Sequence, residues 1–470
     1  MLNADLLRAS DAGDISKVRS LLECQQLSVN VYDISTEETA LMMAAQKGHI
    51  DIIKILLAHS QIDVNKKQIS GLSAYMVAAE NGQTDVMELL LAHEDLDVDT
   101  EAALILAAGA GQTATVKLLL GDEQTDATQI FHSSGHPYDG YTALAIAAKN
   151  GHYDTVELLL SDGNVDINEG DINDNTPLMH AAFSIQLNIT QLLLSKENVD
   201  INKANKNGDT ALHFAVFPNH VDVYKTVKLL LGQDDIDVNK RNKVGRTALI
   251  FAADHFDKVE ALKLLLDNDN IDVNAIDYGK RRRWVDGSFS NQSYTALMVA
   301  INTNNGPATG PLLRHDNIDV NKGNNNGWTA LMMASCMWIR DQVVRLLNHD
   351  QIDVNIKNNV GRTALFYAVG GAGYHKCGGS GSDNILSHDG VEVNAKDDSG
   401  TTALMWAKDV DIAQKLLDHA AIEVTTECQE AEVAEVRDLI CQHVNNAQDN
   451  TQNPIPMAGR KKRHANKLDL

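Results

Sequence analysis

A four-residue motif of the type Ile-Asp-Val-Asn recurs at a nearly fixed interval along most of this 470-residue chain. Many consecutive copies lie 34 or 35 residues apart, as Ile62 and Leu96 do. The copies begin at Leu27, Ile62, Leu96, Val165, Val199, Ile236, Ile271, Ile318, Ile352 and Val391. A fixed period of this size predicts a solenoid, in which each repeat contacts only its neighbours.

One period, from Thr39 to Asn65, predicts two short helices followed by an extended loop. Thr39 is a helix-capping residue type, and the Ala/Leu/Met-rich stretch after it has helical spacing. Gly48 can adopt the left-handed conformation that ends a helix, and from Ile53 apolar residues recur at i, i+3 and i+4. Helices shorter than roughly 12 residues are marginal alone in water, so each unit must pack against its copies.

The start of the first helix keeps the same phase as the loop motif, mostly as Thr-Ala-Leu. Its fullest form is Thr-Pro-Leu-Met-His-Ala-Ala at 176–182, and Thr-Ala-Leu-His-Phe-Ala-Val begins at Thr210. With Asn-Gly-His at Asn150 and Leu-Leu-Leu before Val-Asp-Ile-Asn, this pattern resembles the ankyrin repeat. The resemblance implies an all-α ankyrin-repeat solenoid of about 12 helix-turn-helix units with β-hairpin loops, forming a curved stack.

The repeats divide the chain into an array at 1–445 and a polar, basic tail at 446–470, which we expect to be disordered. Three insertions interrupt the period, at 121–141, 277–294 and 370–384. Pro307 and Pro311 fall where the second helix of the ninth unit should run, so we expect local fraying near 303–312. The glycine-rich third insertion is also expected to fray.

Charge and cysteine usage limit the class of protein. The chain has 64 Asp and Glu against 40 Lys and Arg, a net charge of -24, which argues against a general nucleic-acid or anionic-membrane binder. Five scattered cysteines indicate no disulfide framework and favour a reducing compartment. No apolar run approaches the roughly 18 residues of a membrane span, and the start lacks a secretory signal. We expect a monomeric, cytoplasmic protein that could also enter the nucleus.

The sequence contains no catalytic motif that we can recognise, which predicts that the protein is not an enzyme and binds no cofactor, metal or small-molecule substrate. His375 and Cys377 lack nearby partner ligands and are interpreted as incidental. The ankyrin resemblance implies a structural, hydrogen-bonding role for His213. The loop asparagines are predicted to bond turn backbones, and the resemblance also permits their hydroxylation.

Two sets of residues on the hairpins and first helices are not required by the repeat pattern, and both are candidates for partner binding. The basic set comprises Lys203, Lys206, Lys240, Arg241, Lys243, Arg246, Lys280, Arg281, Arg282, Arg283, Lys322, Lys357, Arg362 and Lys396. The apolar set comprises Phe183, Phe217, Trp328, Met337 and Trp338. The basic set predicts a positive strip for a partner with an acidic segment, or else solvated hairpin tips. The apolar set predicts partner contacts, or else packing against the neighbouring hairpin.

These observations favour a protein–protein interaction scaffold or adaptor that binds a partner protein on the concave groove of the array. The preferred contact is Arg281 to Trp284, where basic and aromatic residues occur together. An alternative is a nuclear regulatory protein that contacts nucleic acid or chromatin through the basic loop and the tail. Its basis is the run Gly-Arg-Lys-Lys-Arg at 459–463, which resembles a nuclear-import motif but also fits a solvated tail.

Overall fold

The computed structural model describes most of the chain. It leaves out residues 1, 25–26, 123–124, 134, 279–280, 283–288, 291, 338, 371–380, 425–430, 432 and 453–470, and gives only the backbone of 281–282, 289–290 and 446–452. The described residues belong to two compact regions, Met1–Asp277 and Tyr278–Leu470, which we call the N-terminal and C-terminal regions.

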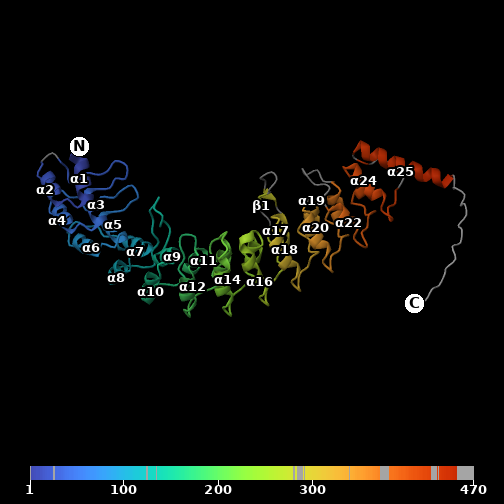
Figure 1. Ribbon diagram of the computed structural model, residues 1–470. Helices are drawn as coiled ribbons and strands as arrows, with labels where there is room; N and C mark the ends of the chain where they lie inside the picture. The colour runs from blue at the N-terminus through green and yellow to red at the C-terminus, as the bar shows by residue number, and fades with distance from the viewer. Residues whose placement is uncertain are drawn as a thin grey trace, which may run out of the picture. The chain divides into compact units, whose positions relative to one another are not determined.

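The N-terminal region consists of eight helix pairs, which we number as repeats in chain order (Figure 1). Its helices are α1 (Leu2–Ala12), α2 (Ile15–Leu22), α3 (Ala40–Lys47), α4 (Ile50–Leu57), α5 (Ala74–Glu80), α6 (Thr84–Leu91), α7 (Thr100–Gly109), α8 (Thr113–Leu120), α9 (Ala143–Asn150), α10 (Tyr153–Ser161), α11 (Pro177–Phe183), α12 (Leu187–Leu194), α13 (Ala211–Val216), α14 (Val223–Leu231), α15 (Ala248–Ala252), the 3₁₀ helix η1 (Phe256–Lys258) and α16 (Val259–Leu266).

The C-terminal region continues the pattern with four further helix pairs and a closing helix. Its elements are β1 (Arg281–Arg282), β2 (Phe289–Ser290), α17 (Ala296–Asn302), α18 (Gly306–Leu313), α19 (Ala330–Cys336), α20 (Arg340–Leu347), α21 (Ala364–Ala368), α22 (Ser382–Leu386), α23 (Ala403–Trp406), α24 (Val410–Leu417) and α25 (Ala434–Gln452). Strands β1 and β2 pair antiparallel, with Arg281 opposite Ser290.

Within each region the first helices of successive repeats pack on one another, and so do the second helices. In the N-terminal region α3 contacts α5, α5 contacts α7 and α7 contacts α9, while α4 contacts α6 and α6 contacts α8 (Figure 1). In the C-terminal region α17, α19, α21 and α23 form the corresponding series. The core lies between these two layers, and the predicted all-α repeat solenoid is confirmed.

The residues that define the period also define the helix ends. The Thr39 hydroxyl accepts a hydrogen bond from Met42 N at 3.2 Å, which satisfies one of the unpaired N–H groups at the start of α3. Gly48 ends that helix in the left-handed region, with φ of 71°. Leu41 and Leu56 point into the core and are buried. Local sequence therefore sets the helix boundaries, and packing between repeats stabilises the helices.

The loop asparagines connect neighbouring repeats. Asn168 Nδ2 donates to Asn198 O at 2.7 Å, and Asn168 Oδ1 accepts from Asp200 N at 2.7 Å. The same pair of bonds is made by Asn30, Asn65, Asn202, Asn239, Asn321, Asn355 and Asn394. The predicted structural role is confirmed, but these amides bond the backbone of the following repeat and not that of their own turn.

The prediction of local fraying near 303–312, in the second helix of the ninth repeat, is wrong. Helix α18 forms there with Pro307 in its first turn, where a missing N–H costs nothing. The side chain of Asn305 caps the helix by accepting from Ala308 N at 3.3 Å. Pro311 does remove an internal hydrogen bond, but Leu312 is fully buried and holds the helix in the stack. Tertiary packing here outweighs local propensity.

The insertions differ in how much the structure describes. In the first, Phe131 N donates to Tyr141 O at 2.9 Å and Gly140 N donates to Phe131 O at 2.7 Å, so the ends of a closed loop are bonded together. Only the short β1–β2 ladder and the flanking residues of the second are described. Most of the third, at 371–380, lies outside the described residues, although α22 begins within its predicted span. Helix α25 likewise crosses the predicted array boundary at 445.

Cysteine pairing departs from the expectation drawn from the sequence. Cys336 and Cys441 each take part in a disulfide, whereas Cys24 is a free thiol. The sequence indicates no disulfide framework, so these bonded cysteines are a departure from that expectation. Spacing along the chain could not reveal this, because disulfide pairing depends on which residues folding brings together.

Candidate protein-interaction surface

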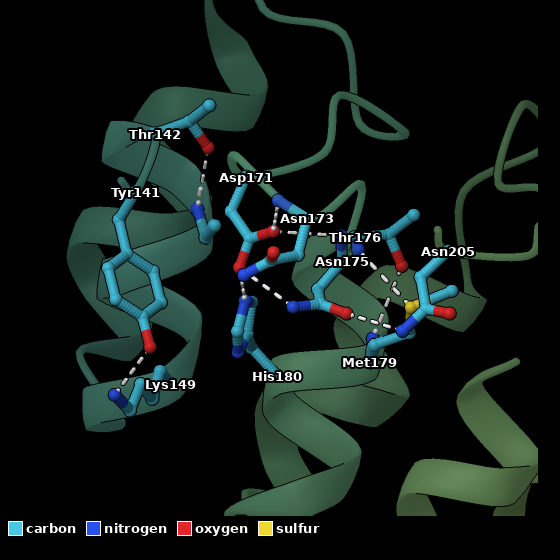
Figure 2. A network of polar contacts seen from close by, with 11 residues as sticks. Tyr141, Thr142, Lys149, Asp171, Asn173, Asn175, Thr176, Met179, His180 and Asn205 are labelled. Atoms are coloured by element: carbon cyan, nitrogen blue, oxygen red, sulfur yellow. Dashed lines mark hydrogen bonds and ion pairs between the residues drawn. The ribbon is translucent and has the colours of Figure 1, made fainter. Parts of the chain in front are cut away.

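A buried polar network holds the hairpin of the sixth repeat to its helix α11 and links it to the hairpin of the seventh repeat (Figure 2). Asp171 Oδ2 accepts from His180 Nε2 at 2.9 Å and from Asn175 Nδ2 at 2.9 Å. Asn205 Nδ2 in turn donates to Asn175 Oδ1 at 2.7 Å, which links the next hairpin to this one. Burial disfavours the charged form of Asp171 and so raises its pKa. Hydrogen bonds from His180, Asn175 and backbone N–H groups stabilise the carboxylate more strongly, and the net result is a lowered pKa. Every partner of this carboxylate serves the fold, so it has a structural role.

His213 has the structural role that the sequence predicts. Its Nδ1 accepts from Thr210 N at 3.1 Å, and its Nε2 donates to Arg246 O of the next hairpin at 3.0 Å. Burial lowers the pKa of His213, although the hydrogen bond to Arg246 O opposes that effect. The neutral imidazole therefore acts as a fixed link between two repeats.

Two of the predicted apolar residues lie in a continuous row of phenylalanine rings along the first helices α11, α13 and α15. Phe183 lies 6.2 Å from Phe214, Phe214 lies 5.2 Å from Phe217, and Phe217 lies 4.8 Å from Phe251, measured between ring centroids. We call these four residues the aromatic row. Phe183 is 44% exposed and the other three are partly exposed, so the row presents ring surface to solvent.

The sequence reasoning missed Phe214 and Phe251, which join the two predicted rings. A signal was available, because Phe214 and Phe251 both fall four residues after the capping threonine of their helices. Arg246 lies beside the row, with its guanidinium carbon 5.2 Å from the Phe251 ring centroid. Its Nε also lies 3.5 Å from Oδ2 of the buried Asp277, which restrains the position of the guanidinium.

Several predicted basic residues bond to neighbouring hairpins. The Nζ atoms of Lys203, Lys206 and Lys357 donate to the backbone carbonyls of Asn168, Ile172 and Lys396, respectively. Arg241 Nη1 donates to Ile276 O at 3.3 Å, and its Nη2 lies 3.8 Å from Asp272. These cations therefore satisfy carbonyl groups at the hairpin edges. The side chain of Lys240, by contrast, makes no hydrogen bond or ion pair to any residue that the structure describes.

The C-terminal region holds three more predicted residues. Trp328 packs against Tyr367 with ring centroids 4.2 Å apart, which matches the alternative of packing between repeats. Arg362 Nε donates to Asp397 Oδ2 at 3.0 Å, and its guanidinium carbon lies 4.0 Å from the Trp406 ring centroid. Met337, at the end of α19, is 39% exposed. Of the three, Met337 is the most available to a partner.

The remaining predicted residues are only partly covered by the structure. Arg281 and Arg282 form strand β1, and their backbone alone is described. Arg283, Trp284 and Trp338 lie outside the described residues. The preferred contact at Arg281 to Trp284 thus stays a prediction.

Two other features are absent from the part of the chain that the structure describes. None of the helices in that part combines the length and apolar character needed to cross a membrane. Within the same part of the chain, no group of three or more His, Cys, Asp or Glu side chains is arranged to hold a metal ion. His375 and Cys377 fall in the segment that is not described.

A protein-family model matches several overlapping segments of the chain. The model described as "Ankyrin repeats (3 copies)" matches residues 6–102, 63–130, 104–205, 186–277 and 282–358. The matches overlap through the whole N-terminal region and extend into the C-terminal region, so they cover more than half of the chain.

Proposed function

Because the chain belongs to the ankyrin-repeat family, we propose that it is a scaffold or adaptor that acts by binding a partner protein and not by catalysis. Ankyrin repeats are typically protein–protein interaction modules, and their function resides in surface residues carried on a common frame. The binding surface would be made of hairpins and first helices, which carry the residues that the repeat itself does not require.

The aromatic row is the observation that carries this proposal. Four rings from three successive repeats form one surface strip, with Phe183 and Phe217 as its most favourable anchors. Aromatic residues supply much of the binding energy when a partner buries them. Arg246 at the edge of the row adds a cation that a partner could engage without moving the guanidinium far.

The acidic character of the partner is a separate part of the proposal. It rests on basic residues such as Lys240 and on the arginine run at 281–283. A partner segment with aspartate or glutamate beside apolar residues would suit both the row and these cations.

The test is affinity capture with the purified full chain as bait, followed by titration of the recovered partner. We expect the double variant Phe183→Ala/Phe217→Ala to weaken its binding by roughly 10- to 100-fold, as loss of two hot-spot rings would. Tyr153→Ala is the matched control, because Tyr153 is similarly exposed but lies on the second helix α10.

Equal binding by the double variant and the control would refute the role of the aromatic row. Replacing Arg281, Arg282 and Arg283 with Glu tests the acidic segment independently. If the main partner is indifferent to that change, the partner does not use this basic loop.

A further inference from the structure

Adjacent hairpins in the N-terminal region are joined by a regular backbone hydrogen bond. Ile172 N donates to Gly140 O at 2.8 Å, and Lys206 N donates to Asn173 O at 3.0 Å. In each hairpin, one residue donates its N–H to the preceding hairpin, and the residue directly after it accepts from the following hairpin. In the sixth repeat these two residues are Ile172 and Asn173. Ile69 N likewise donates to Thr36 O at 3.1 Å, so the next acceptor in the series is Ser70 O.

The fourth repeat has no hairpin to use that acceptor. Its loop motif runs from Leu96 to Asp99 and leads directly into α7, which begins at Thr100. The Asp99 side chain caps this helix by accepting from Ala102 N at 2.9 Å. The fourth repeat therefore places no hairpin at the position where its neighbours have one.

The insertion in the following repeat reaches across this position. The Ser133 hydroxyl donates to Ser70 O, replacing the backbone N–H that the absent hairpin would provide. His136 from the same loop lies 3.6 Å from Glu80, measured from Nε2 to Oε1. The insertion thus bridges the third and fifth repeats but does not fill the space between them.

A cleft of about 650 Å³ remains beneath the bridge. Its walls are the third-repeat hairpin at 67–71 and the insertion at 129–133, and its floor includes Asp99, Glu101 and Ile105. Ile69 on one wall is 64% exposed, so it offers apolar surface to a ligand in the cleft. The volume is in the range of sites that bind ligands.

The lining of the cleft has more acidic than basic side chains, because it includes both Asp99 and Glu101. In the surrounding sequence, residues 61–141 contain 13 Asp and Glu but only 3 Lys and no Arg. Asp99 and Glu101 form no ion pair with any residue in the described part of the chain. Lys67 is the single Lys or Arg in the lining. A cleft with low-dielectric walls and an excess of negative charge attracts positively charged groups to its mouth.

We propose that the cleft binds a basic, turn-forming segment of a partner protein, which takes the place of the hairpin that the fourth repeat lacks. A lysine or arginine of the segment would pair with Asp99 and Glu101, and an aliphatic side chain would cover the exposed Ile69. This site lies in different repeats from the aromatic row and favours the opposite charge. It therefore goes beyond the proposed function and does not depend on it.

The chain itself supplies a suitable probe. The hairpin before α15, Val-Asn-Lys-Arg-Asn-Lys-Val-Gly-Arg-Thr at 238–247, is both basic and turn-forming. A fluorescein-labelled synthetic peptide of this sequence is titrated with the full-length protein, and fluorescence polarisation reports binding. We expect saturable binding, which is lost when the four basic residues are replaced by Gln. A scrambled peptide of equal charge should bind at least fivefold more weakly if the turn matters.

Two variants locate the binding in the cleft. Glu101→Gln should weaken binding about fivefold, the value of an ion pair near 1 kcal/mol, and Ile69→Asn should weaken it to a similar degree. Neither residue is buried, so both variants should keep the circular dichroism spectrum and melting temperature of the parent. Glu157→Gln, which changes an exposed carboxylate on α10, is the matched control.

Absence of saturable binding overturns the proposal. If the scrambled peptide binds as tightly as the native sequence, recognition depends on charge alone and the proposed turn-forming segment is refuted. Unchanged affinity in both Glu101→Gln and Ile69→Asn would place the peptide elsewhere on the chain and also overturn it. None of these outcomes bears on the aromatic row, which is tested with other variants.

Discussion

Replacing Asn168 with alanine tests whether the loop asparagines join one repeat to the next. The substitution removes a donor to Asn198 O and an acceptor for Asp200 N, both at 2.7 Å. Both partners belong to the following repeat, so the bonds contribute to the interface between the sixth repeat and its neighbour. In an array of this kind, stability is a sum of repeat terms and interface terms, and a weakened interface lowers the stability of both repeats.

The expected loss follows from these two hydrogen bonds. Each net hydrogen bond contributes about 0.5 to 1.5 kcal/mol, which gives roughly 1 to 3 kcal/mol for the pair. Asn168 is only partly buried, so water can replace part of what is lost and the lower half of that range is expected. Asn168→Asp should cost less, because its carboxylate still accepts from Asp200 N.

Urea unfolding followed by far-ultraviolet circular dichroism measures the loss of stability. Hydrogen exchange at the Asp200 amide gives a local readout, and we expect faster exchange there in Asn168→Ala. Asn164→Ala is the matched control, because the Asn164 side chain makes no hydrogen bond to any residue that the structure describes. Equal unfolding midpoints for the two variants, with unchanged exchange at Asp200, would refute the reasoning.

Three further predictions concern single contacts. Ser133→Ala should remove the bridge to Ser70 O, cost about 1 kcal/mol and speed proteolysis of the insertion, whereas Ser161→Ala should not affect the loop. The folded-state pKa of His213 lies below its ordinary value of 6.5, so the unfolded state binds protons more readily and stability falls as the pH drops below 6.5. His213→Met should therefore flatten the dependence of the urea midpoint on pH in this range. An unchanged pH profile in the variant would contradict the prediction. Arg362→Met should leave the buried Asp397 without its cation and lower thermal stability by about 1 to 2 kcal/mol, while an unchanged melting temperature would show that the pair contributes nothing.

The sequence alone determined the features that depend on neighbours within one repeat. The fixed period, the capping threonines and the glycine helix ends are local patterns, and they predicted the helix pairs. The structural role of His213 was implied by the resemblance to the ankyrin repeat. The local patterns were sufficient because each repeat meets nearly the same surroundings as the one before it. The prolines were misjudged for the same reason: local propensity predicted fraying around Pro307 and Pro311, whereas the cap from Asn305 and the buried Leu312 maintain α18.

Only the tertiary structure decided which distant residues meet. Ser133 and Ser70 are 63 positions apart, and nothing in the local pattern shows that the Ser133 hydroxyl takes the place of a hairpin N–H as the donor to Ser70 O. Phe214 and Phe251 became part of the candidate site because stacking aligns the first helices of successive repeats. The period predicts that repeats stack, but the side chains that touch depend on the length of each hairpin. Where one hairpin is missing and the next is long, the structure leaves a cleft that the repeat pattern does not predict.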